Sequence, residues 1–370
     1  MASASSLGGC ACGAIRYEIS ADPIVKNDCQ CRDCQRMSGT GHGSLQDQRR
    51  LVSAQRVRSW SSGYWHWRGR WNNAILCLSI FRNHAVLQTR YTVTLVTCDA
   101  QPLLTRSDRA LKEELENLGA SVRVAIWTDG EVDWSASDLT VIRSTWDGCT
   151  RFREFEGWLR RIEGETRVCN PVEKILWNFE KHYLVDLHRR GIAIIPTVYF
   201  QAESSVSLDP TDVNWPAVVA KPSIGGSSMA VRRFSVPAEL SLLEDHLNGI
   251  LARTGALMQR FEETVTTLAE RSLVFIGGEY SHAVRRIPFN TGDTPDSPQF
   301  DHEAEEAEIA FATQVLEVSD SKKLSFARVD ILPSPTGLLL MELELIEPAL
   351  FLTRKTGAAR KLASALLALL

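Results

Sequence analysis

Apolar positions in the second part of the chain follow two alternating periodicities, which predict strands and helices in turn. The runs YTVTLVTCDA, SVRVAIWTD and DLTVIRST are rich in β-branched residues and predict strands. Between the first two runs, SDRALKEELENLGA has apolar residues at helical spacing, with Ser107 or Asp108 as its cap and Gly119 at its end. Strands that alternate with helices predict a small parallel sheet.

The third of these strands ends in RSTWD, residues 143–147. Ligands of parallel sheets lie beyond the carboxyl ends of the strands, so this segment is a candidate substrate loop. A capped turn explains the same residues equally well.

The next part of the chain predicts a helix and then several strands. NPVEKILWNFEKHYLVDLHRRG begins with the helix-start residues Asn170 and Pro171 and ends at Gly191. IAIIPTVYF and ALMQRF predict strands, and ERSLVFIGGEYSHAVRR predicts a hairpin that turns at its Gly-Gly pair. Alternation along the second strand of this hairpin puts Arg285 and Arg286 on opposite faces.

A strand that ends at Lys221 is followed by a loop with two glycines and three serines. Backbone N–H groups in such a loop can contact phosphate oxygens. The loop is not a Walker A motif, because no G-K-[ST] opens a helix here. A Gly/Ser loop between strands is usually a simple hairpin turn, but the lysine at the strand end favours a phosphate site.

The run SFARVDILPSPTGLLLMELELIEP predicts a hairpin that carries carboxylates on an otherwise apolar background. If the turn centres near Pro335, Arg328 lies opposite Glu342, and Asp330 and Glu344 point to the same side. Three carboxylates and one arginine on one face are typical of a Mg²⁺ site. The alternative is a solvated face that carries a salt bridge. Glu347 falls on the other side of the alternation, where it predicts a salt bridge or a cap outside the site.

Composition limits the class of protein. The 370 residues are enough for two or three domains, and 44% hydrophobic with 23% charged residues is ordinary for a globular protein. A net charge of −4 gives no general attraction to nucleic acid or to an anionic membrane. The N-terminus lacks the features of a secretory signal, and LASALLALL is too short to span a bilayer. We therefore expect a cytoplasmic protein with small-molecule partners, with a homodimer as an open alternative.

The first 90 residues have a different composition. Five of the nine cysteines fall within the first 34 residues, and in a cytoplasmic protein such a cluster favours metal ligands over disulfides. Residues 48–97 contain eight Arg and no Asp or Glu, together with several Trp. Such a segment could stack on nucleic acid, but a poorly ordered linker is the favoured interpretation because no motif accompanies the bias.

Several segments in the same order resemble the ATP-grasp superfamily, in particular the cycloserine-biosynthesis branch. They are LVTCDAQPLLTRSD, VDWSASDLTVIRSTWD, NPVEKILWNFEKHYLVDL, VVAKPSIGGSS, ERSLVFIGGEYSHAVRR, FARVDIL and LMELELIEP. The resemblance implies an α/β and α+β protein with the ATP-grasp fold: a small parallel domain, then two lobes that clasp ATP. It implies an ATP-dependent carboxylate–amine ligase that acts through an acyl phosphate.

The resemblance also implies roles for individual residues. The ATP phosphates would be contacted by Lys181, Lys221 and Ser227, and the ribose would be held by Glu270. The adenine hinge would be lined, largely through backbone groups, by Gln259, Arg260 and Phe261. The catalytic residues would be Arg286 and Arg328, and the Mg²⁺ ligands would be Asp330, Glu342 and Glu344. Many superfamily members have Asn at the position of Glu344, and a carboxylate there also suits Mg²⁺.

The N-terminal cysteines resemble the start of the glutathione-dependent formaldehyde-activating enzymes, which are built on zinc. Cys29, Cys31 and Cys34 would form one zinc site, and Cys10 and Cys12 would form half of a second. The resemblance ends after Ser44, and the later C-x-x-C pair of the family is absent, so we interpret this part as a truncated, Cys-rich β module that precedes the ATP-grasp fold. The expected domains are a zinc-binding fragment (1–45), a basic Trp-rich linker (46–90), a pre-ATP-grasp domain (91–170), an ATP-grasp domain (171–355) and a C-terminal helix (356–370).

Three functional hypotheses follow from these features. The first is an ATP- and Mg²⁺-dependent ligase that acts on a small amino-acid-like substrate. The second is a zinc protein related to carbon–sulfur lyases, with its activity or metal binding in the N-terminal cysteines. The third is an ATP-binding regulator without ligase turnover.

Overall fold

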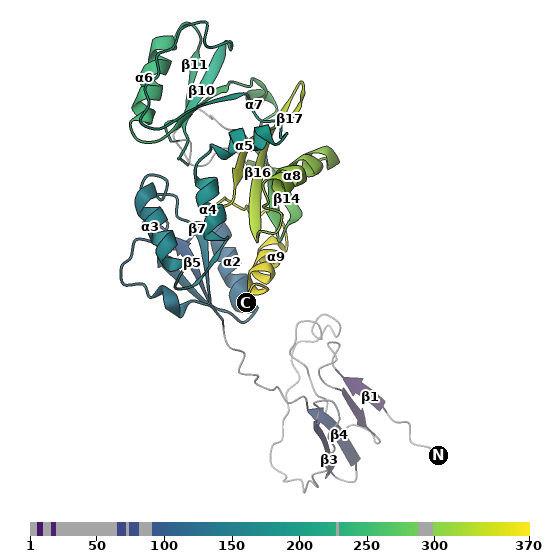
Figure 1. Cartoon of the computed structure of the whole chain (residues 1–370). Coiled ribbons are helices and arrows are strands. Elements are labelled where there is room, and N and C mark those ends of the chain that lie inside the picture. Colours follow the sequence, from purple (N-terminus) through teal and green to yellow (C-terminus); the bar gives the residue numbers. More distant parts are fainter. Residues whose placement is uncertain are drawn as a thin grey trace. The chain divides into compact units, whose positions relative to one another are not determined.

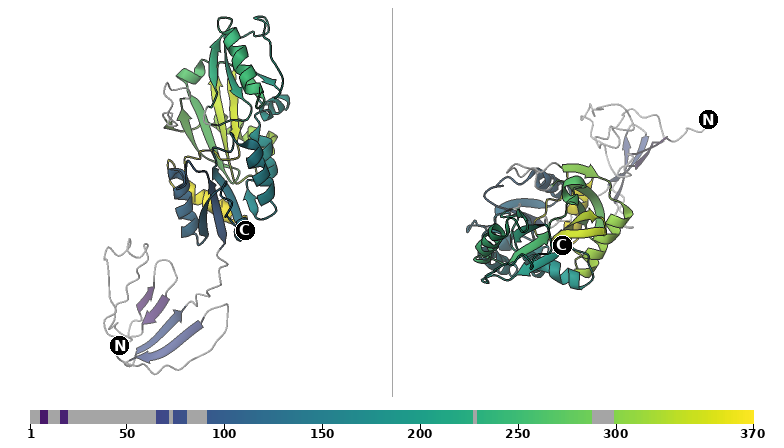
Figure 2. Two further views of the ribbon diagram at one scale, coloured as in Figure 1. Left: turned by 90° about the vertical axis from the view of Figure 1, so that its left-hand side faces the viewer. Right: turned by 90° about the horizontal axis from the view of Figure 1, so that it is seen from above.

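The chain forms two compact units, Met1–Thr89 and Arg90–Leu370, and each is described by itself. Figures 1 and 2 show their elements. The structure is a computed structural model. It describes residues 6–9, 16–19, 65–71, 74–80, 91–226, 229–287 and 299–370.

The first unit contains a four-stranded antiparallel sheet in the order β1-β2-β4-β3. The sequence predicted a linker for residues 46–90, but two of these strands lie in that segment. Trp65, Trp67 and Trp71 follow a period of two there, which is a strand pattern despite the basic composition. Cys10, Cys12, Cys29, Cys31 and Cys34 lie outside the described residues. The strands are β1 (Ser6–Gly9), β2 (Arg16–Ile19), β3 (Trp65–Trp71) and β4 (Ala74–Ile80).

A parallel sheet in the order β6-β5-β7-β8 begins the second unit, as the alternating pattern predicted. The cap of its first helix differs from the prediction. Thr105, rather than Ser107 or Asp108, is the N-cap, because Asp108 is buried and bonded to Arg143. The elements are β5 (Thr92–Thr97), α2 (Arg106–Asn117), β6 (Ser121–Ile126), the 3-10 helix η1 (Trp134–Ala136), β7 (Leu139–Ser144), α3 (Phe152–Ile162) and β8 (Arg167–Cys169).

Two short helices and an antiparallel sheet in the order β11-β10-β12-β9 follow. The sequence predicted one helical segment from Asn170 to Gly191, but the structure divides it. Lys181 lies at the break, where its N–H donates to the carbonyl of Ser223 (2.8 Å). The elements are α4 (Val172–Phe179), α5 (Tyr183–Arg189), β9 (Thr197–Phe200), β10 (Ala217–Pro222), β11 (Arg232–Ser235), α6 (Leu240–Leu251) and β12 (Ala256–Arg260).

The last sheet has five antiparallel strands in the order β15-β14-β13-β16-β17. Its apolar face packs on α5 and α8 through residues such as Leu184, Leu316 and Val329. The C-terminal helix α9 returns to the parallel sheet and packs beside α2 (Figure 1). The elements are α7 (Thr264–Thr267), β13 (Glu270–Ile276), β14 (Glu279–Arg286), β15 (Gln299–His302), α8 (Glu306–Val318), β16 (Phe326–Ser334), β17 (Gly337–Glu344) and α9 (Ala358–Leu367).

The register of the β16–β17 hairpin differs from the predicted one. Arg328 lies opposite Glu344, and Asp330 lies opposite Glu342, because a bulge shifts the pairing by one residue at Met341. Without this extra residue, Glu342 would lie opposite Val329 and would share the buried face. The bulge therefore puts both glutamates on the same face as Arg328 and Asp330.

We expect a chain that begins at Arg90 to fold on its own and to retain ATP turnover. The unit Arg90–Leu370 contains three complete sheets and their buried cores. Thermal unfolding and ADP production of the shortened chain should match those of the full chain. Aggregation or lost turnover would show that the first unit is needed for the second.

Candidate active site

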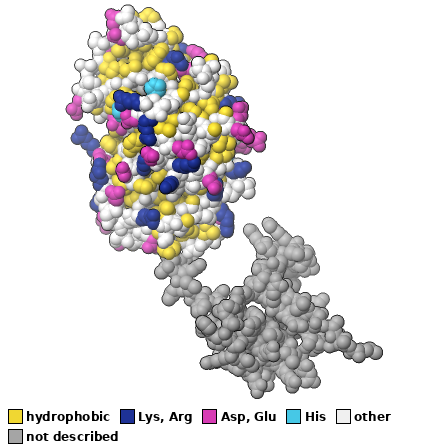
Figure 3. All heavy atoms as spheres, turned by 45° about the vertical axis from the view of Figure 1, so that its right-hand side comes forward, with side chains coloured by type: hydrophobic (Ala, Val, Ile, Leu, Met, Phe, Trp, Pro, Cys, Tyr) yellow, Lys and Arg dark blue, Asp and Glu magenta, His cyan; other side chains and the backbone are white. Residues whose placement is uncertain are grey.

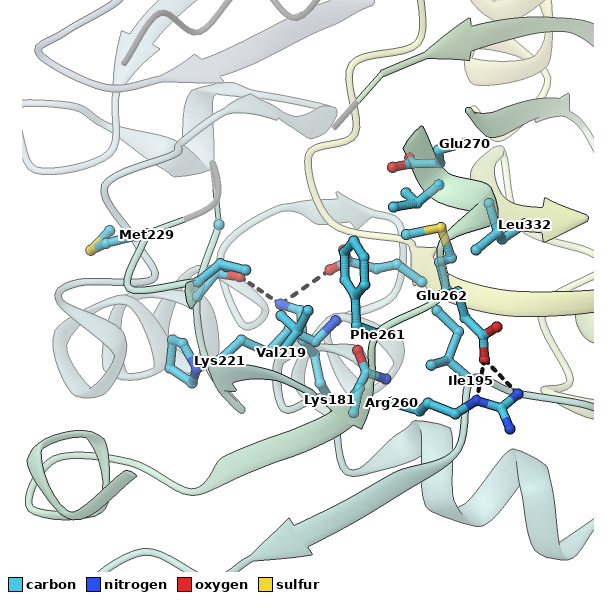
Figure 4. Close-up of a pocket in the computed structure, with 18 of the residues that line it drawn as sticks. Lys181, Ile195, Val219, Lys221, Met229, Arg260, Phe261, Glu262, Glu270 and Leu332 are labelled. Atoms are coloured by element: carbon cyan, nitrogen blue, oxygen red, sulfur yellow. Dashed lines mark hydrogen bonds and ion pairs between the residues drawn. The ribbon is translucent and has the colours of Figure 1, made fainter. Parts of the chain in front are cut away.

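A cavity of about 160 Å³ lies between the β9–β12 sheet and the β13–β17 sheet. Its wall contains eight of the residues that the sequence proposed for ATP and Mg²⁺ (Figure 4). Apolar side chains form much of the rest of the cavity wall, and none of them was predicted from the sequence to be part of a site. They look like ordinary strand residues, and only the packing of the two sheets brings them to one cavity. The eight are Lys181, Lys221, Gln259, Arg260, Phe261, Glu270, Glu342 and Glu344, and the apolar residues include Ile195, Val219, Val265, Leu332 and Met341.

The proposed hinge residues lie at the end of β12, and several of their polar groups already have partners. The side chain of Gln259 donates to Thr197 Oγ1 (2.9 Å), and that of Arg260 forms an ion pair with Glu262 (2.6 Å). The N–H groups of Arg260 and Phe261 donate to backbone carbonyls (both 2.9 Å). Backbone contacts of these two residues with a base would therefore involve their carbonyl groups.

Two lysines line the cavity, and their surroundings shift their pKa values in opposite directions. Lys181 Nζ lies 3.1 Å from Glu342 Oε1 and donates to the carbonyl of Gly225 (2.6 Å; Figure 4). Burial opposes its charge, but Glu342 raises the pKa of Lys181 above its usual value. Lys221 forms no ion pair within the described part of the chain, and burial lowers its pKa. Lys221 is therefore the cation with the most to gain from a phosphate.

Three carboxylates of the β16–β17 hairpin converge at one end of the cavity. One oxygen each from Asp330, Glu342 and Glu344 lies within 4.8 Å of the others. Burial raises the pKa of Glu344 to about 7, although Arg328 opposes the shift. Burial acts in the same direction on the other two, but Lys181 and Lys221 hold the pKa of Glu342 below its usual value, and Arg328 and Arg286 do the same for Asp330. The cluster offers only oxygen ligands, which suits a hard cation such as Mg²⁺.

The two candidate catalytic arginines lie behind these carboxylates. Arg286 contacts Glu270 and lies 3.2 Å from Asp330. Arg328 is 3% exposed and contacts Asp330 (2.8 Å) and Glu344. Burial raises the pKa of Glu270 to about 7 although Arg286 opposes the shift. Arg328 is thus placed to position the carboxylates, whereas the less buried Arg286 can also turn toward a phosphoryl group.

The candidate substrate loop 143–147 is partly committed to the structure. Arg143 is buried and forms an ion pair with Asp108 (2.8 Å), and Ser144 Oγ donates to the same carboxylate (2.7 Å). Trp127 Nε1 donates to Asp147 Oδ1 (2.8 Å). The start of the loop is therefore a structural anchor. Ser227, from the Gly/Ser loop, lies outside the described residues.

Glu347 does not have the salt bridge or cap that the sequence predicted. Its Oε2 atom is buried without a hydrogen-bond partner, and no ion pair involves this carboxylate within residues 91–226, 229–287 and 299–370. Burial raises the pKa of Glu347 to about 8, and the charge of Glu344 adds to this shift. The prediction was wrong because it assumed a solvated strand end, whereas the segment after β17 folds back into the protein.

We expect Glu347→Gln to stabilise the ligand-free protein increasingly as the pH rises from about 5 to 8. The pKa of Glu347 is raised to about 8 in the folded state, so ionisation of this carboxyl costs stability in this range. Glutamine does not titrate. Melting temperatures across this range are the measurement, and Glu317→Gln, at an exposed position of α8, is the matched control. A melting-temperature difference that does not change with pH would contradict a raised pKa at Glu347.

Comparison with known proteins identifies the family. The cycloserine biosynthesis protein DcsG of Streptomyces lavendulae is 31% identical over 276 residues, which span 69% of this chain and 91% of the relative. This chain belongs to the DcsG family. It is an ATP-grasp ligase, an ATP-dependent enzyme that forms C–N bonds. The model of the N-terminal domain of D-cycloserine synthetase DcsG matches residues 93–170.

Solved structures agree with the DcsG assignment. The crystal structure of D-cycloserine synthetase DcsG superposes with a TM-score of 0.69 at 28% identity and covers 74% of this chain and 98% of that one. D-alanine–D-alanine ligase from Bacillus anthracis, complexed with ATP, has a TM-score of 0.54 at 12% identity over 75% of this chain and 96% of that one. At this identity the second similarity shows the shared ATP-grasp fold. The α/β and α+β fold class predicted from the sequence is thus confirmed.

The first unit matches a different family. The model of the glutathione-dependent formaldehyde-activating enzyme matches residues 5–62. The match therefore continues past Ser44, where the resemblance was expected to end.

In the described part of the chain, no helix has the length and apolarity needed to cross a membrane. Acidic, basic and hydrophobic side chains are intermixed on the face of the second unit in Figure 3.

Proposed function

We propose that the second unit activates the carboxylate of a small amino-acid-like substrate with ATP and Mg²⁺, and that an amine then attacks the acyl phosphate. The observation that carries this proposal is the meeting of three carboxylates and two lysines at a cavity whose wall also has many apolar side chains. An apolar cleft suits an adenine, and the charged end suits a triphosphate with its metal. The cycloserine-related names of its relatives support an amino-acid-derived substrate.

The residues fit the requirements of phosphoryl transfer. Lys221 and Lys181 would contact phosphate oxygens, and Arg286 would contact the transferred phosphoryl group as its charge shifts. Arg328 would keep Asp330 and Glu344 in place. The carboxylate of a substrate is a poor acyl donor, and its phosphorylation supplies a good leaving group for the attacking amine.

The carboxylate cluster fits Mg²⁺ by its chemistry. Asp330, Glu342 and Glu344 present oxygen atoms within 4.8 Å of one another, and Arg286, Arg328 and Lys181 contact them. When bound, Mg²⁺ would neutralise charge on the phosphates of ATP. Gln259, Arg260 and Phe261 would hold the adenine, Glu270 the ribose, and Ser227 would reach a phosphate from the Gly/Ser loop.

A turnover screen with hydroxylamine tests this function. The full chain is incubated with ATP, Mg²⁺, hydroxylamine and each of a panel of amino acids. We expect Mg²⁺-dependent ADP production with one group of acids, together with a hydroxamate that identifies the activated carboxylate. ATP binding without ADP production on any acid would instead favour a regulator without ligase turnover.

For the first unit we propose a separate zinc site. The family match over residues 5–62 supports this proposal, because Cys29, Cys31 and Cys34 fall within it with the short spacing typical of zinc ligands. Cys10 and Cys12 would supply half of a second site. Elemental analysis of the full chain should find zinc that is lost on Cys31→Ser, and zinc without any ADP production would favour a zinc protein over a ligase.

A further inference from the structure

The segment that follows β17 is held rigidly by side chains from other elements. Asn178 Oδ1 accepts from the N–H of Leu345 (2.8 Å), and Asn170 Nδ2 donates to the carbonyl of the same residue (2.8 Å). Arg143 Nη2 donates to the carbonyl of Pro348 (2.9 Å). Glu347 lies between these fixed points, so the position of its backbone is set by the fold.

Glu347 and the loop 143–147 each carry buried polar atoms without partners in the portion that the structure describes. Of the seven buried side-chain atoms that lack a partner among the described residues, three belong to Glu347, Arg143 and Thr145. Arg143 and Thr145 are 2% and 1% exposed. Arg143 and Asp147 are close enough to Glu347 to affect its pKa, so the candidate substrate loop 143–147 lies near this carboxylate. Buried polar groups are normally paired, so the unpaired acceptor of Glu347 calls for a donor that the described residues do not supply.

Neither nearby cation forms an ion pair with Glu347 in the described part of the chain. Arg143 is already compensated by Asp108 at 2.8 Å, and Lys181 by Glu342 at 3.1 Å. Glu347 follows Glu344 by three residues, so it lies just beyond the proposed metal ligands and on the side of loop 143–147. Lys181 and Glu344, which line the cavity, are close enough to Glu347 to affect its pKa, so a group bound there would lie near the proposed phosphate contacts.

We propose that Glu347 binds the ammonium group of the amino acid whose carboxylate is activated. This inference rests on the proposed ligase function and adds a rule of substrate selection to it. A substrate with its carboxylate at the phosphate end directs a neighbouring ammonium group toward Glu347, where it forms a charge-assisted hydrogen bond. An acid with a hydroxyl in place of the amine leaves the carboxylate unpaired, so the site selects amino acids over 2-hydroxy acids.

The kinetic test compares an amino acid with its 2-hydroxy analogue. The probes are the amino acid with the highest turnover in the hydroxylamine screen and the 2-hydroxy acid with the same side chain, beginning with serine and glycerate in both configurations. In Glu347→Gln we expect the KM for the amino acid to rise about tenfold or more, as for a lost charge-assisted hydrogen bond. The KM for ATP and the half-saturating Mg²⁺ concentration should stay nearly unchanged. Glu347→Asp should recover part of the preference for the amino acid, and the control Glu317→Gln should retain all of it.

A binding measurement separates this proposal from the ligase function. Calorimetry with D-serine and L-serine, in the presence of Mg²⁺ and a non-hydrolysable ATP analogue, should detect binding to the native chain that Glu347→Gln weakens. If the native chain turns over amino acids but Glu347→Gln keeps the native KM and the native preference over hydroxy acids, the ammonium site is wrong and the ligase stands. If no amino acid gives turnover or binding, both proposals fail.

Discussion

Replacing Glu342 or Glu344 with glutamine is expected to raise the Mg²⁺ concentration for half-maximal turnover and to lower the rate by about 100-fold. Changes in the residues that only support metal ligands already cost about 10–100-fold, so loss of a ligand charge should reach the upper end of this range. The two glutamates share one face with Asp330, and their oxygen atoms lie within 4.8 Å of it. Initial rates across a Mg²⁺ titration are the measurement.

The two variants should differ in stability without metal. Near pH 7, Glu344→Gln should leave the melting temperature level or raise it. Burial raises the pKa of Glu344 from 4.5 to about 7, so this carboxyl lowers stability as the pH rises between these values, and the loss persists at higher pH. Glu342→Gln should lower the melting temperature. Despite burial, Lys181 and Lys221 keep the pKa of Glu342 below its usual value. The charge of Glu342 therefore stabilises the fold at every pH above the usual pKa of a glutamate.

Glu347→Gln serves as the control for the metal ligands, and its Mg²⁺ dependence should remain nearly native. If Glu347→Gln raises the Mg²⁺ requirement as much as Glu344→Gln does, the metal lies on a different face of the hairpin. Native Mg²⁺ dependence in both Glu342→Gln and Glu344→Gln would remove the cluster from the catalytic site.

Lys221→Ala is expected to lower the affinity for ATP by about tenfold to 100-fold. A hydrogen bond to a charged group contributes about 1.5–3 kcal/mol, and Lys221 has no competing ion pair among the residues that the structure describes. Without ATP the variant should melt at the same or a higher temperature, because burial lowers the pKa of Lys221 and so disfavours its charge. Calorimetric titration with a non-hydrolysable ATP analogue is the measurement.

Lys181→Ala and Lys322→Ala make informative comparisons. Lys181 is paired with Glu342, so its loss should reduce stability as well as ATP affinity. Lys322 is half-exposed and pairs with Glu317, so its loss should change neither property by a measurable amount. An unchanged ATP affinity in a folded Lys221→Ala variant would exclude Lys221 from the phosphate site.

Local patterns in the sequence were enough to predict most strands, three helical segments and the fold class of the second unit. The helices α3, α6, α7 and α8 were not predicted. β-branched runs favour strands wherever they occur, and Gly277 and Gly278 adopt the positive φ angles that the predicted hairpin turn needs. The choice of Asp330, Glu342 and Glu344 as partners also came from the sequence, because carboxylates within apolar strands require a cationic partner. The strands β3 and β4 of the first unit were missed because the basic composition of residues 46–90 concealed the strand pattern there.

The tertiary structure decided how these groups meet. One extra residue at Met341 shifts the register of the hairpin and turns both glutamates toward Asp330, and the local pattern of alternation does not reveal such a bulge. Arg143, expected in a substrate loop, lies in β7 and is held by Asp108 of helix α2, a contact between residues 35 positions apart. The unpaired state of Glu347 likewise depends on which side chains from distant segments surround it. Alternation specifies the side of a strand that a residue occupies, but partners and pKa values depend on the packing of elements that are far apart in the chain.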